Sequence, residues 1–363
     1  MKNTIVFLNT ILFLSLCLSA CNKPGGKDQG AIKQFEASAN KSPQPAMFKT
    51  NEYFPLLKGK RVGVVANHTS TFGKIHLVDS LKNTGINIVR VFGPEHGFRG
   101  DAAAGAYVET YIDQKSGIEV YSLYGKNKKP TVESLKGIDI LLFDIQDVGA
   151  RFYTYISSLS YVMESAAENH IPLIILDRPN PNGHYVDGPV MEQQLTSFVG
   201  LHPIPIVHGM TIGEYALMVN GERWLSNGLQ CEVKVILANN YSHTDRFLIT
   251  IPPSPNLPDS KSVILYPSIC LFEGTVISPG RGTDKPFKVF GHPDLPVSKY
   301  PCSFIPVSTP AAPKPPLLGQ KCNGLDLSLL SEESLIKSGK LNLQWLIESY
   351  KAFPAKEKFF TPF

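Results

Sequence analysis

The stretch Asp-Ile-Leu-Leu-Phe-Asp, residues 139–144, is a continuous apolar run with an aspartate at each end. A second run of this kind, Pro-Leu-Ile-Ile-Leu-Asp, occupies residues 172–177. Strands that are apolar on both faces are typical of parallel sheets covered by helices on both sides. Residues 153–169, between the two runs, have the pattern of one long helix. The segment therefore predicts a strand, a helix and a second, parallel strand.

The same alternation continues on both sides of this unit. Thr211 and Glu214 form a capping-box signature for a helix that runs through Trp224. Further strands are predicted at residues 61–66, 87–92 and 232–237, and a further helix at residues 75–83. Regular alternation of strands and helices indicates an α/β fold, here a Rossmann-like doubly wound parallel sheet.

The composition changes near residue 251, which predicts a domain boundary. Prolines crowd the following loop-rich passage, and helical patterns recur at residues 341–351. We predict a Rossmann-like catalytic domain at residues 51–250 and a smaller C-terminal α+β domain at residues 251–363.

The N-terminus resembles a bacterial lipoprotein signal. Residues 5–18 are an apolar core too short for a comfortable membrane span, and Leu18-Ser19-Ala20-Cys21 follows with small residues before a cysteine. We predict a signal peptide at residues 1–20, acylation of Cys21, and a flexible tether at residues 21–50. The protein would then be lipid-anchored in the cell envelope, on the periplasmic face or the outer membrane. The alternative is an ordinary cleaved signal peptide and a free secreted protein.

Several chemistries lack their sequence signals. A net charge of +4 over 363 residues, without a basic block, gives no indication of nucleic-acid binding. The glycine patterns of dinucleotide-binding and P-loop proteins are missing, so no nucleotide cofactor is expected, and no Cys-x-x-Cys or His-Glu-x-x-His spacing suggests a metal. A Gly-x-Ser-x-Gly elbow is also missing. Four cysteines, Cys231, Cys270, Cys302 and Cys322, allow three disulfide pairings, and the sequence does not choose among them.

Polar side chains follow four successive predicted strands. Their positions are Asn67-His68, Glu95-His96, Asp144 with Asp147 and Arg151, and Asp177-Arg178. Any one of these groups is more often a helix cap or a turn residue than a catalytic one. Together they predict a polar cleft at the carboxyl edge of the sheet, where ligands of such sheets bind. The residue types suit acid–base chemistry on a hydroxyl-rich substrate.

These residues belong to longer motifs in one collinear order from about residue 53 to the end. The motifs are Gly-Pro-Glu-His-Gly (93–97), Tyr-Ser-Leu-Tyr-Gly (121–125), Phe-Asp-Ile-Gln-Asp-Val-Gly-Ala-Arg-Phe-Tyr-Thr-Tyr (143–155), Asp-Arg-Pro-Asn-Pro (177–181), His-Gly-Met-Thr-Ile-Gly-Glu (208–214), Pro-Ser-Pro-Asn (253–256), Glu-Gly-Thr (273–275) and Ser-Pro-Gly-Arg-Gly-Thr (278–283). The set resembles the NamZ-type exo-β-N-acetylmuramidases. The resemblance implies a cofactor-independent glycosidase that removes terminal β-linked N-acetylmuramic acid from the non-reducing end of peptidoglycan fragments.

On this resemblance we expect Glu95 to be the general acid, with His96 beside it. Its loop is flanked by glycines and partly enclosed. The second carboxylate that such hydrolases need stays open among Asp144, which we prefer, Asp147, Asp101 and Glu109. A separation of about 5–5.5 Å between the two carboxyl groups would predict retention of configuration, and about 6.5–9.5 Å inversion.

The remaining expected site residues bind substrate. Arg99, Arg151 and Arg281 are the candidates for the lactyl carboxylate of N-acetylmuramic acid, because a guanidinium holds a carboxylate in a bidentate pair. The other expected contacts are Asn67, Asp147, Tyr155, His208 and Asn256. For any one of the histidines a structural role is more common than a catalytic one. About half of such arginines form only a surface or interdomain ion pair.

Two alternatives use the same cleft: an exo-N-acetylglucosaminidase, and a peptidoglycan-binding lipoprotein without catalysis. The family usually continues past the point that corresponds to Phe363, so the resemblance also predicts a shortened C-terminal domain.

Overall fold

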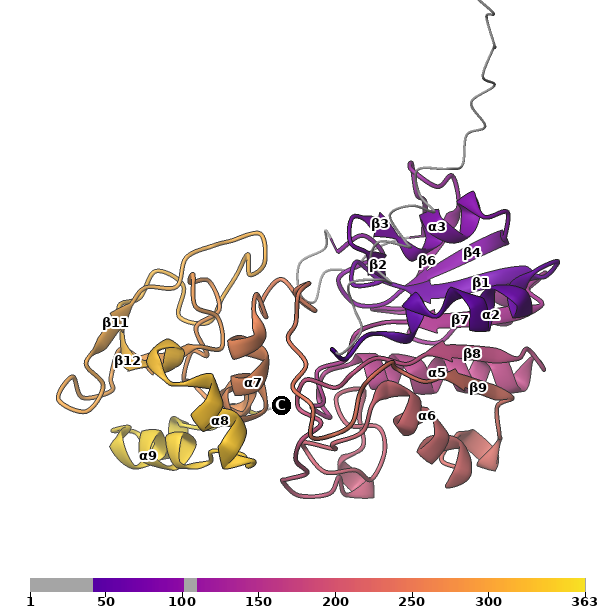
Figure 1. Cartoon of the computed structure of the whole chain (residues 1–363). Coiled ribbons are helices and arrows are strands. Elements are labelled where there is room, and N and C mark those ends of the chain that lie inside the picture. The colour runs from indigo at the N-terminus through magenta and orange to yellow at the C-terminus, as the bar shows by residue number, and fades with distance from the viewer. Residues whose placement is uncertain (1–41, 101–109, 363) are drawn as a thin grey trace, which may run out of the picture. The chain divides into compact units, whose positions relative to one another are not determined.

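In the computed structural model, residues 42–100 and 110–362 are described. Within them, seven strands form one sheet in the order β5-β6-β4-β1-β7-β8-β9, and Figure 1 shows its central strands as neighbouring arrows. All neighbours are parallel except β5, which runs antiparallel to β6. The bounds are β1 Arg61–Ala66, β4 Asn87–Gly93, β5 Tyr111–Ile112, β6 Glu119–Ser122, β7 Ile140–Asp144, β8 Leu173–Leu176 and β9 Val233–Ile236.

The strand order confirms the predicted doubly wound sheet. After β1 the chain builds outward through β4 and β6, then returns to the other side of β1 and continues through β7, β8 and β9. The direction of winding therefore reverses between β1 and β7. In such sheets the carboxyl ends of the strands at the reversal point form a crevice. Asn67 and the segment after Asp144 lie at this point.

Two apolar cores cover the two faces of the sheet, because alternate side chains of each strand point to opposite faces. Val62 and Val64 pack with helices α2 and α3, whereas Val65 packs with α5 and α6. The helices of this part are α2 Thr50–Leu57, α3 Leu77–Asn83, α4 Val132–Leu135, α5 Tyr155–Glu168 and α6 Ile212–Gly221. The predicted capping box of Thr211 and Glu214 is present at the start of α6.

The helix expected at residues 75–83 begins later than predicted. Residues Ile75–His76 form strand β3, which pairs with β2, Thr71–Phe72. The His76 ring accepts a hydrogen bond from the Val78 amide and so caps α3. Histidine is not a common N-cap, which is why the spacing of apolar residues alone did not reveal this start.

The predicted tether at residues 21–50 needs a correction at its C-terminal end. Residues Ala46–Phe48 form a 3-10 helix, and Met47 is 1% exposed. The Met47 carbonyl accepts a hydrogen bond from the Tyr53 hydroxyl at 2.7 Å, and Gln44 forms a β-bridge with Asn239. Buried Ala46 and Met47, together with these hydrogen bonds, hold this segment against the rest of the protein. The predicted signal peptide, Cys21 and residues 22–41 of the predicted tether lie outside the described residues.

The C-terminal part has the predicted mixed α+β composition. Strands β10 Val289–His292, β12 Cys322–Asp326 and β11 Cys302–Phe304 form an antiparallel sheet in that order. The helices are α7 Ser260–Ile269, α8 Glu332–Ser338 and α9 Gln344–Ala352. The four described cysteines are free thiols, so none of the three possible pairings is formed. No helix within residues 42–100 or 110–362 is both long and apolar enough to span a membrane.

Candidate active site

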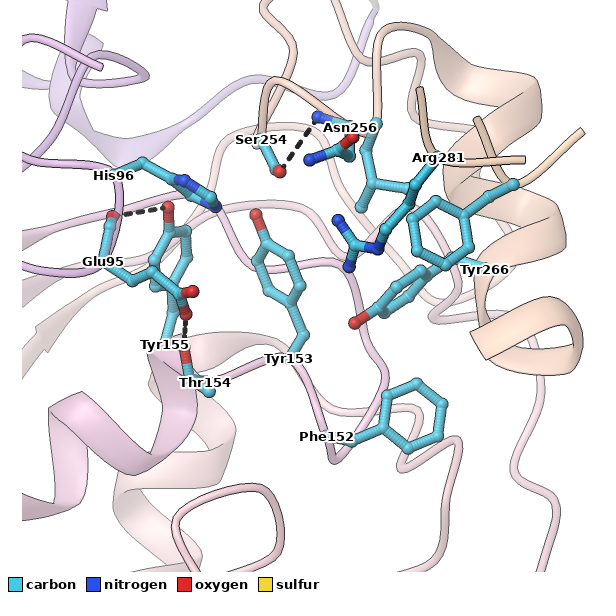
Figure 2. Close-up of a pocket in the computed structure, with 12 residues that line it drawn as sticks. Glu95, His96, Phe152, Tyr153, Thr154, Tyr155, Ser254, Asn256, Tyr266 and Arg281 are labelled. Atoms are coloured by element: carbon cyan, nitrogen blue, oxygen red, sulfur yellow. Dashed lines mark hydrogen bonds between the residues drawn. The ribbon is translucent and has the colours of Figure 1, made fainter. Parts of the chain in front are cut away.

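A pocket with about 410 Å³ of empty space lies beyond the carboxyl end of β4. Its lining comes from both sides of residue 251, as Figure 2 shows. Glu95, His96 and residues 152–155 contribute from the first part of the chain, and residues 254–257, Tyr266, Arg281 and Phe287 contribute from the second. The pocket therefore joins several of the predicted motifs in one place.

Glu95 is the one carboxylate among the described residues that line this pocket. It is partly exposed, and its Oε2 accepts a hydrogen bond from the Thr154 hydroxyl at 2.9 Å (Figure 2). Tyr124 also interacts with Glu95, since burial and then the Glu95 carboxylate raise the pKa of the Tyr124 phenol to about 12. The Glu95 carboxylate thus interacts with two hydroxyl groups, and Glu95 still lines the pocket.

The loop that carries Glu95 is tightly turned. The Gly97 amide donates to the Pro94 carbonyl at 3.0 Å, and a side chain at Gly93 would meet the Phe98 amide nitrogen at 3.0 Å. His96 is buried and has a φ of 71°, a left-handed conformation that costs a non-glycine residue about 1–3 kcal/mol. In Figure 2 its ring points toward Tyr153 and Tyr155. The surrounding fold stabilises a strained backbone that places this imidazole in the pocket.

Two phenols form the floor beside Glu95. The Tyr153 hydroxyl donates to the Pro253 carbonyl at 2.8 Å, and the Tyr155 hydroxyl lies 3.3 Å from the same oxygen. Their rings meet edge to face at 4.8 Å. Burial raises the pKa of both phenols, so they stay protonated at neutral pH. Tyr155 thus lines the pocket as predicted, at the first turn of α5.

Arg281 is the one guanidinium among the described lining residues. Its Nε donates to Glu273 Oε1 at 2.5 Å, and the group lies 4.9 Å from the centre of the Phe287 ring. Glu273 therefore fixes the Nε side, and Nη1 and Nη2 have no hydrogen-bond partner among the described residues. Asn256 also lines the pocket, with its Nδ2 donating to the Ala311 carbonyl at 2.9 Å.

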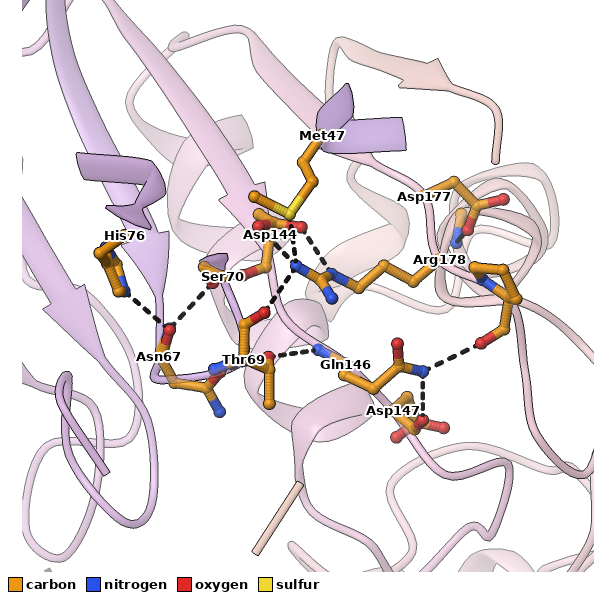
Figure 3. A network of polar contacts seen from close by, with 12 residues as sticks. Met47, Asn67, Thr69, Ser70, His76, Asp144, Gln146, Asp147, Asp177 and Arg178 are labelled. Carbon is orange, nitrogen blue, oxygen red and sulfur yellow. Dashed lines mark hydrogen bonds and ion pairs between the residues drawn. The ribbon is translucent and has the colours of Figure 1, made fainter. Parts of the chain in front are cut away.

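Asp144, the preferred second carboxylate, does not line this pocket. It is 0% exposed and accepts two hydrogen bonds from Arg178, at 2.6 and 2.8 Å (Figure 3). Arg178 also donates to the Thr69 carbonyl at 3.1 Å. This geometry is a buried structural ion pair, which corrects the expectation that Asp144 faces the cleft. An acidic residue at the end of a strand has the same sequence pattern in either role.

Asp147, His208, Arg151 and Asn67 are buried polar residues that do not line the pocket. Asp147 Oδ2 accepts from the Gly149 amide at 2.7 Å and lies 3.6 Å from His208 Nε2. Among the described residues, Asp147 Oδ1, His208 Nε2, Arg151 Nε and Asn67 Nδ2 are buried atoms without a hydrogen-bond partner. Arg151 instead donates through Nη1 to the carbonyls of Pro189 and Ile204. These four predicted residues are close to the site but do not line the pocket.

Arg99 lies elsewhere. It pairs with Asp79 at 3.1 Å and with Asp113 at 2.7 Å, and it does not line the pocket. Two carboxylates already neutralise its guanidinium, which corrects the expectation that it binds a substrate carboxylate. Asp101 and Glu109 lie outside the described residues.

Sequence reasoning missed several lining residues. Tyr153, Thr154 and Ser254 lie inside quoted motifs, and so does Tyr124, which contacts Glu95. Phe152, Tyr266 and Phe287 add aromatic walls. Their residue types usually indicate packing, so only their place in motifs that contain predicted site residues could have identified them.

The comparisons with known proteins agree with this architecture. The family model for the N-terminal part of the exo-β-N-acetylmuramidase NamZ matches residues 62–261, and the model for the C-terminal part matches residues 264–362. The chain is 45% identical over 297 residues to the peptidoglycan β-N-acetylmuramidase NamZ of Bacillus subtilis strain 168, an alignment that covers 80% of the chain and 70% of that relative.

Two solved structures are also similar, both described as DUF1343 family proteins from Bacteroides fragilis NCTC 9343. One is 49% identical with a TM-score of 0.82 and covers 89% of the chain and 86% of its own. The other is 32% identical with a TM-score of 0.72, and the match covers 87% of this chain and 85% of that structure's chain. Both family models and the curated relative agree, and the chain belongs to the NamZ exo-β-N-acetylmuramidase family.

Proposed function

We propose that this protein is an exo-β-N-acetylmuramidase, a glycosidase that releases terminal β-linked N-acetylmuramic acid from the non-reducing end of peptidoglycan fragments. The family and the activity named for the Bacillus subtilis relative support this assignment. One observation carries it at the site: the pocket has a single described carboxylate, Glu95, and a single described guanidinium, Arg281. N-acetylmuramic acid suits this pair, because Glu95 can protonate its glycosidic oxygen and Arg281 can bind its lactyl carboxylate.

Glu95 acts as the general acid in this proposal. Its carboxyl group protonates the glycosidic oxygen as the bond to the leaving sugar breaks, and a positioned acid contributes about 10²–10⁴-fold to such a step. The Thr154 hydroxyl, 2.9 Å from Oε2, and Tyr124 orient the group. His96 and Tyr155, which line the pocket beside Glu95, would contact the sugar.

Asp147 is the second carboxylate that we propose among the described candidates. Asp144 is fully paired with Arg178, whereas Asp147 keeps one buried oxygen without a partner. Burial is the main cause of the raised pKa of Tyr153 and Tyr155 in the pocket lining, and the Asp147 carboxylate is the smallest of the further causes. Asp147→Asn should lose activity, whereas Asp139→Asn, at a partly exposed carboxylate that pairs with Arg61 before β7 at the opposite sheet edge, should not.

Arg281 binds the lactyl carboxylate. Because Glu273 occupies Nε, the Nη1 and Nη2 edge is available for a bidentate pair. This pair distinguishes N-acetylmuramic acid from N-acetylglucosamine, which has a hydroxyl group at that position.

Two chromogenic glycosides test the proposed function directly. The wild-type protein should release the chromophore from the N-acetylmuramic acid glycoside and react much more slowly with the N-acetylglucosamine analogue. Preference for the analogue would indicate an N-acetylglucosaminidase, and inactivity on both, together with retained saccharide binding, would indicate a binding protein.

We further propose that the protein is a lipoprotein of the cell envelope, anchored through acyl chains on Cys21. The sequence Leu18-Ser19-Ala20-Cys21 after an apolar core supports this. Mass spectrometry of the membrane-extracted protein should find an acylated N-terminal Cys21. An unmodified Cys21 would contradict the anchor.

A further inference from the structure

Two adjacent lysines, Lys128 and Lys129, have different environments. Lys129 Nζ lies 2.7 Å from a carboxylate oxygen of Glu164 and 2.7 Å from one of Glu168. Lys128 has no carboxylate partner among the described residues, and its Nζ lies instead 4.3 Å from the centre of the Phe198 ring. The first lysine is neutralised within the protein. The second is a positioned cation whose charge is not balanced by a neighbouring acid.

Phe198 is itself held in place. Its ring is stacked on Tyr161 with centres 5.9 Å apart and planes at 6°. Tyr161 belongs to α5, while Phe198 belongs to the segment after Pro189 that folds back at the Ser197–Gly200 bridge. A cation above an aromatic ring is attracted by the negative face of the ring. Tyr161, Phe198 and Lys128 thus form a fixed stack, which we call the lysine–aromatic stack.

Two paths through the chain limit how far this stack lies from the partners of Glu95. Lys128 is four residues after Tyr124, which contacts Glu95, so at most about 14 Å of chain separates them. Tyr161 is seven residues after Thr154, the other partner of Glu95, or about 10 Å along α5. Lys129, through Glu164, and the Pro130 carbonyl, through Ser165, fix the intervening loop against α5. Lys128 therefore lies within about 14 Å of Tyr124 along the chain, and Tyr161 lies about 10 Å along α5 from Thr154, a span that a substrate with further sugars beyond the cleaved bond can reach.

We propose that the lysine–aromatic stack is a subsite for the leaving part of the substrate, with Lys128 binding the lactyl carboxylate of the second sugar beyond the cleaved bond. This inference rests on the proposed function. In a strand of alternating N-acetylmuramic acid and N-acetylglucosamine, cleavage of the first residue puts the next lactyl carboxylate two sugars away. The ammonium group of Lys128, which has no carboxylate partner among the described residues, is opposite in charge to this lactyl carboxylate. The subsite makes the enzyme favour longer fragments.

Three saccharides with identical first and second sugars test this subsite. They are the disaccharide of N-acetylmuramic acid and N-acetylglucosamine, the tetrasaccharide that repeats it, and the same tetrasaccharide with the lactyl carboxylate of its third sugar converted to an amide. We expect wild-type kcat/KM for the acid tetrasaccharide to exceed that for the amide by about two- to fivefold at low salt, as for a partly exposed ion pair. The difference should shrink at high ionic strength.

Lys128→Ala should remove the difference between acid and amide and keep the wild-type rate on the disaccharide. Phe198→Leu, which weakens the support of the ammonium, should reduce the difference in part. The control is Lys136→Ala, an exposed lysine just before β7 at the opposite sheet edge, which should behave as wild type. Equal wild-type rates on acid and amide, or an equal loss by Lys128→Ala on all three saccharides, would overturn the subsite. A wild-type protein that cleaves none of them would instead overturn the proposed function.

Discussion

Two groups of charged residues lie near the same edge of the sheet but differ in how their charges are balanced. Around Asp144 the charges are matched internally, since its two oxygens accept from Arg178 in a fully buried pair (Figure 3). Around Glu95 the charged groups face a pocket, and Arg281 keeps two terminal nitrogens without a described partner (Figure 2). Both groups consist of a carboxylate and a guanidinium. What distinguishes the structural group from the proposed functional one is whether each charge is fully paired within the protein.

Burial explains this difference. A carboxylate removed from water is stable only with a partner, and a pair that satisfies both members leaves nothing to bind a ligand. A catalytic carboxyl group needs the opposite, a fixed position with remaining capacity for hydrogen bonds. Substitutions in the two groups should therefore have different effects. Those at the pocket should reduce activity, and those at the buried Asp144–Arg178 pair, which we call the inner pair, should reduce stability.

The largest effect is expected for Glu95→Gln. Without a proton donor at this position, kcat on the disaccharide should fall by about 10²–10⁴-fold, while the free energy of unfolding in urea should stay close to wild type. The amide keeps the shape of the side chain and can still accept from Thr154. Activity within a few-fold of wild type would exclude Glu95 as the acid.

The next effect is expected for Asp144→Asn, which leaves the Arg178 guanidinium buried without its counter-charge. The free energy of unfolding should fall by about 3–5 kcal/mol, measured by urea denaturation. The control, Asp139→Asn, weakens the partly exposed pair with Arg61 and should lower the free energy of unfolding much less. If Asp144→Asn kept full stability and lost only activity, the distinction between the two groups would be wrong.

A third prediction concerns the pH dependence of stability near the inner pair. His76 donates to the Asn67 carbonyl at 2.8 Å and caps α3, and burial lowers the pKa of its ring from 6.5 to about 4. The unfolded chain therefore binds a proton that the folded protein does not between these values. Stability should fall as pH drops from about 6.5 to 4, by up to about 3 kcal/mol from this group.

His76→Asn should reduce that pH dependence, because asparagine caps helices and does not titrate. Urea unfolding of both proteins at several pH values between 4 and 7 measures the two slopes. Identical slopes would show that the buried ring does not set the acid sensitivity.

The smallest of these effects is expected at the pocket cation. Arg281→Ala should reduce the preference for the N-acetylmuramic acid glycoside over the N-acetylglucosamine one by about 10- to 100-fold, the range for a hydrogen bond to a charged group. Arg99→Ala serves as the control, since Asp79 and Asp113 already neutralise that guanidinium, and it should alter stability rather than preference. A preference that survives Arg281→Ala would move the lactyl site elsewhere.

Much of the fold was predictable because its signals are local. The apolar runs at residues 139–144 and 172–177 became β7 and β8, and the capping box at Thr211 became the start of α6. The N-terminal segment around Met47 was not predicted, because its docking depends on a surface built by distant strands. The segment is mostly polar, and its two buried apolar residues, Ala46 and Met47, are too few to form an apolar pattern in the sequence.

The candidate site was only partly predictable for a related reason. Glu95, His96, Tyr155, Asn256 and Arg281 line the pocket, and the motifs had identified all five. Asp144 and Arg99 were expected there and form internal ion pairs instead. A sequence shows which side chains reach the sheet edge, but partners such as Arg178 and Asp113 become known only when the chain is folded.

The most direct test is a crystal structure of the Glu95→Gln variant with the disaccharide of N-acetylmuramic acid and N-acetylglucosamine. We predict that the glycosidic oxygen lies within hydrogen-bond distance of the side chain at position 95, about 2.6–3.2 Å, with the lactyl carboxylate on Arg281. The Asp144–Arg178 pair should be unchanged. A disaccharide bound away from position 95, or one that breaks the inner pair to reach Asp144, would contradict the account.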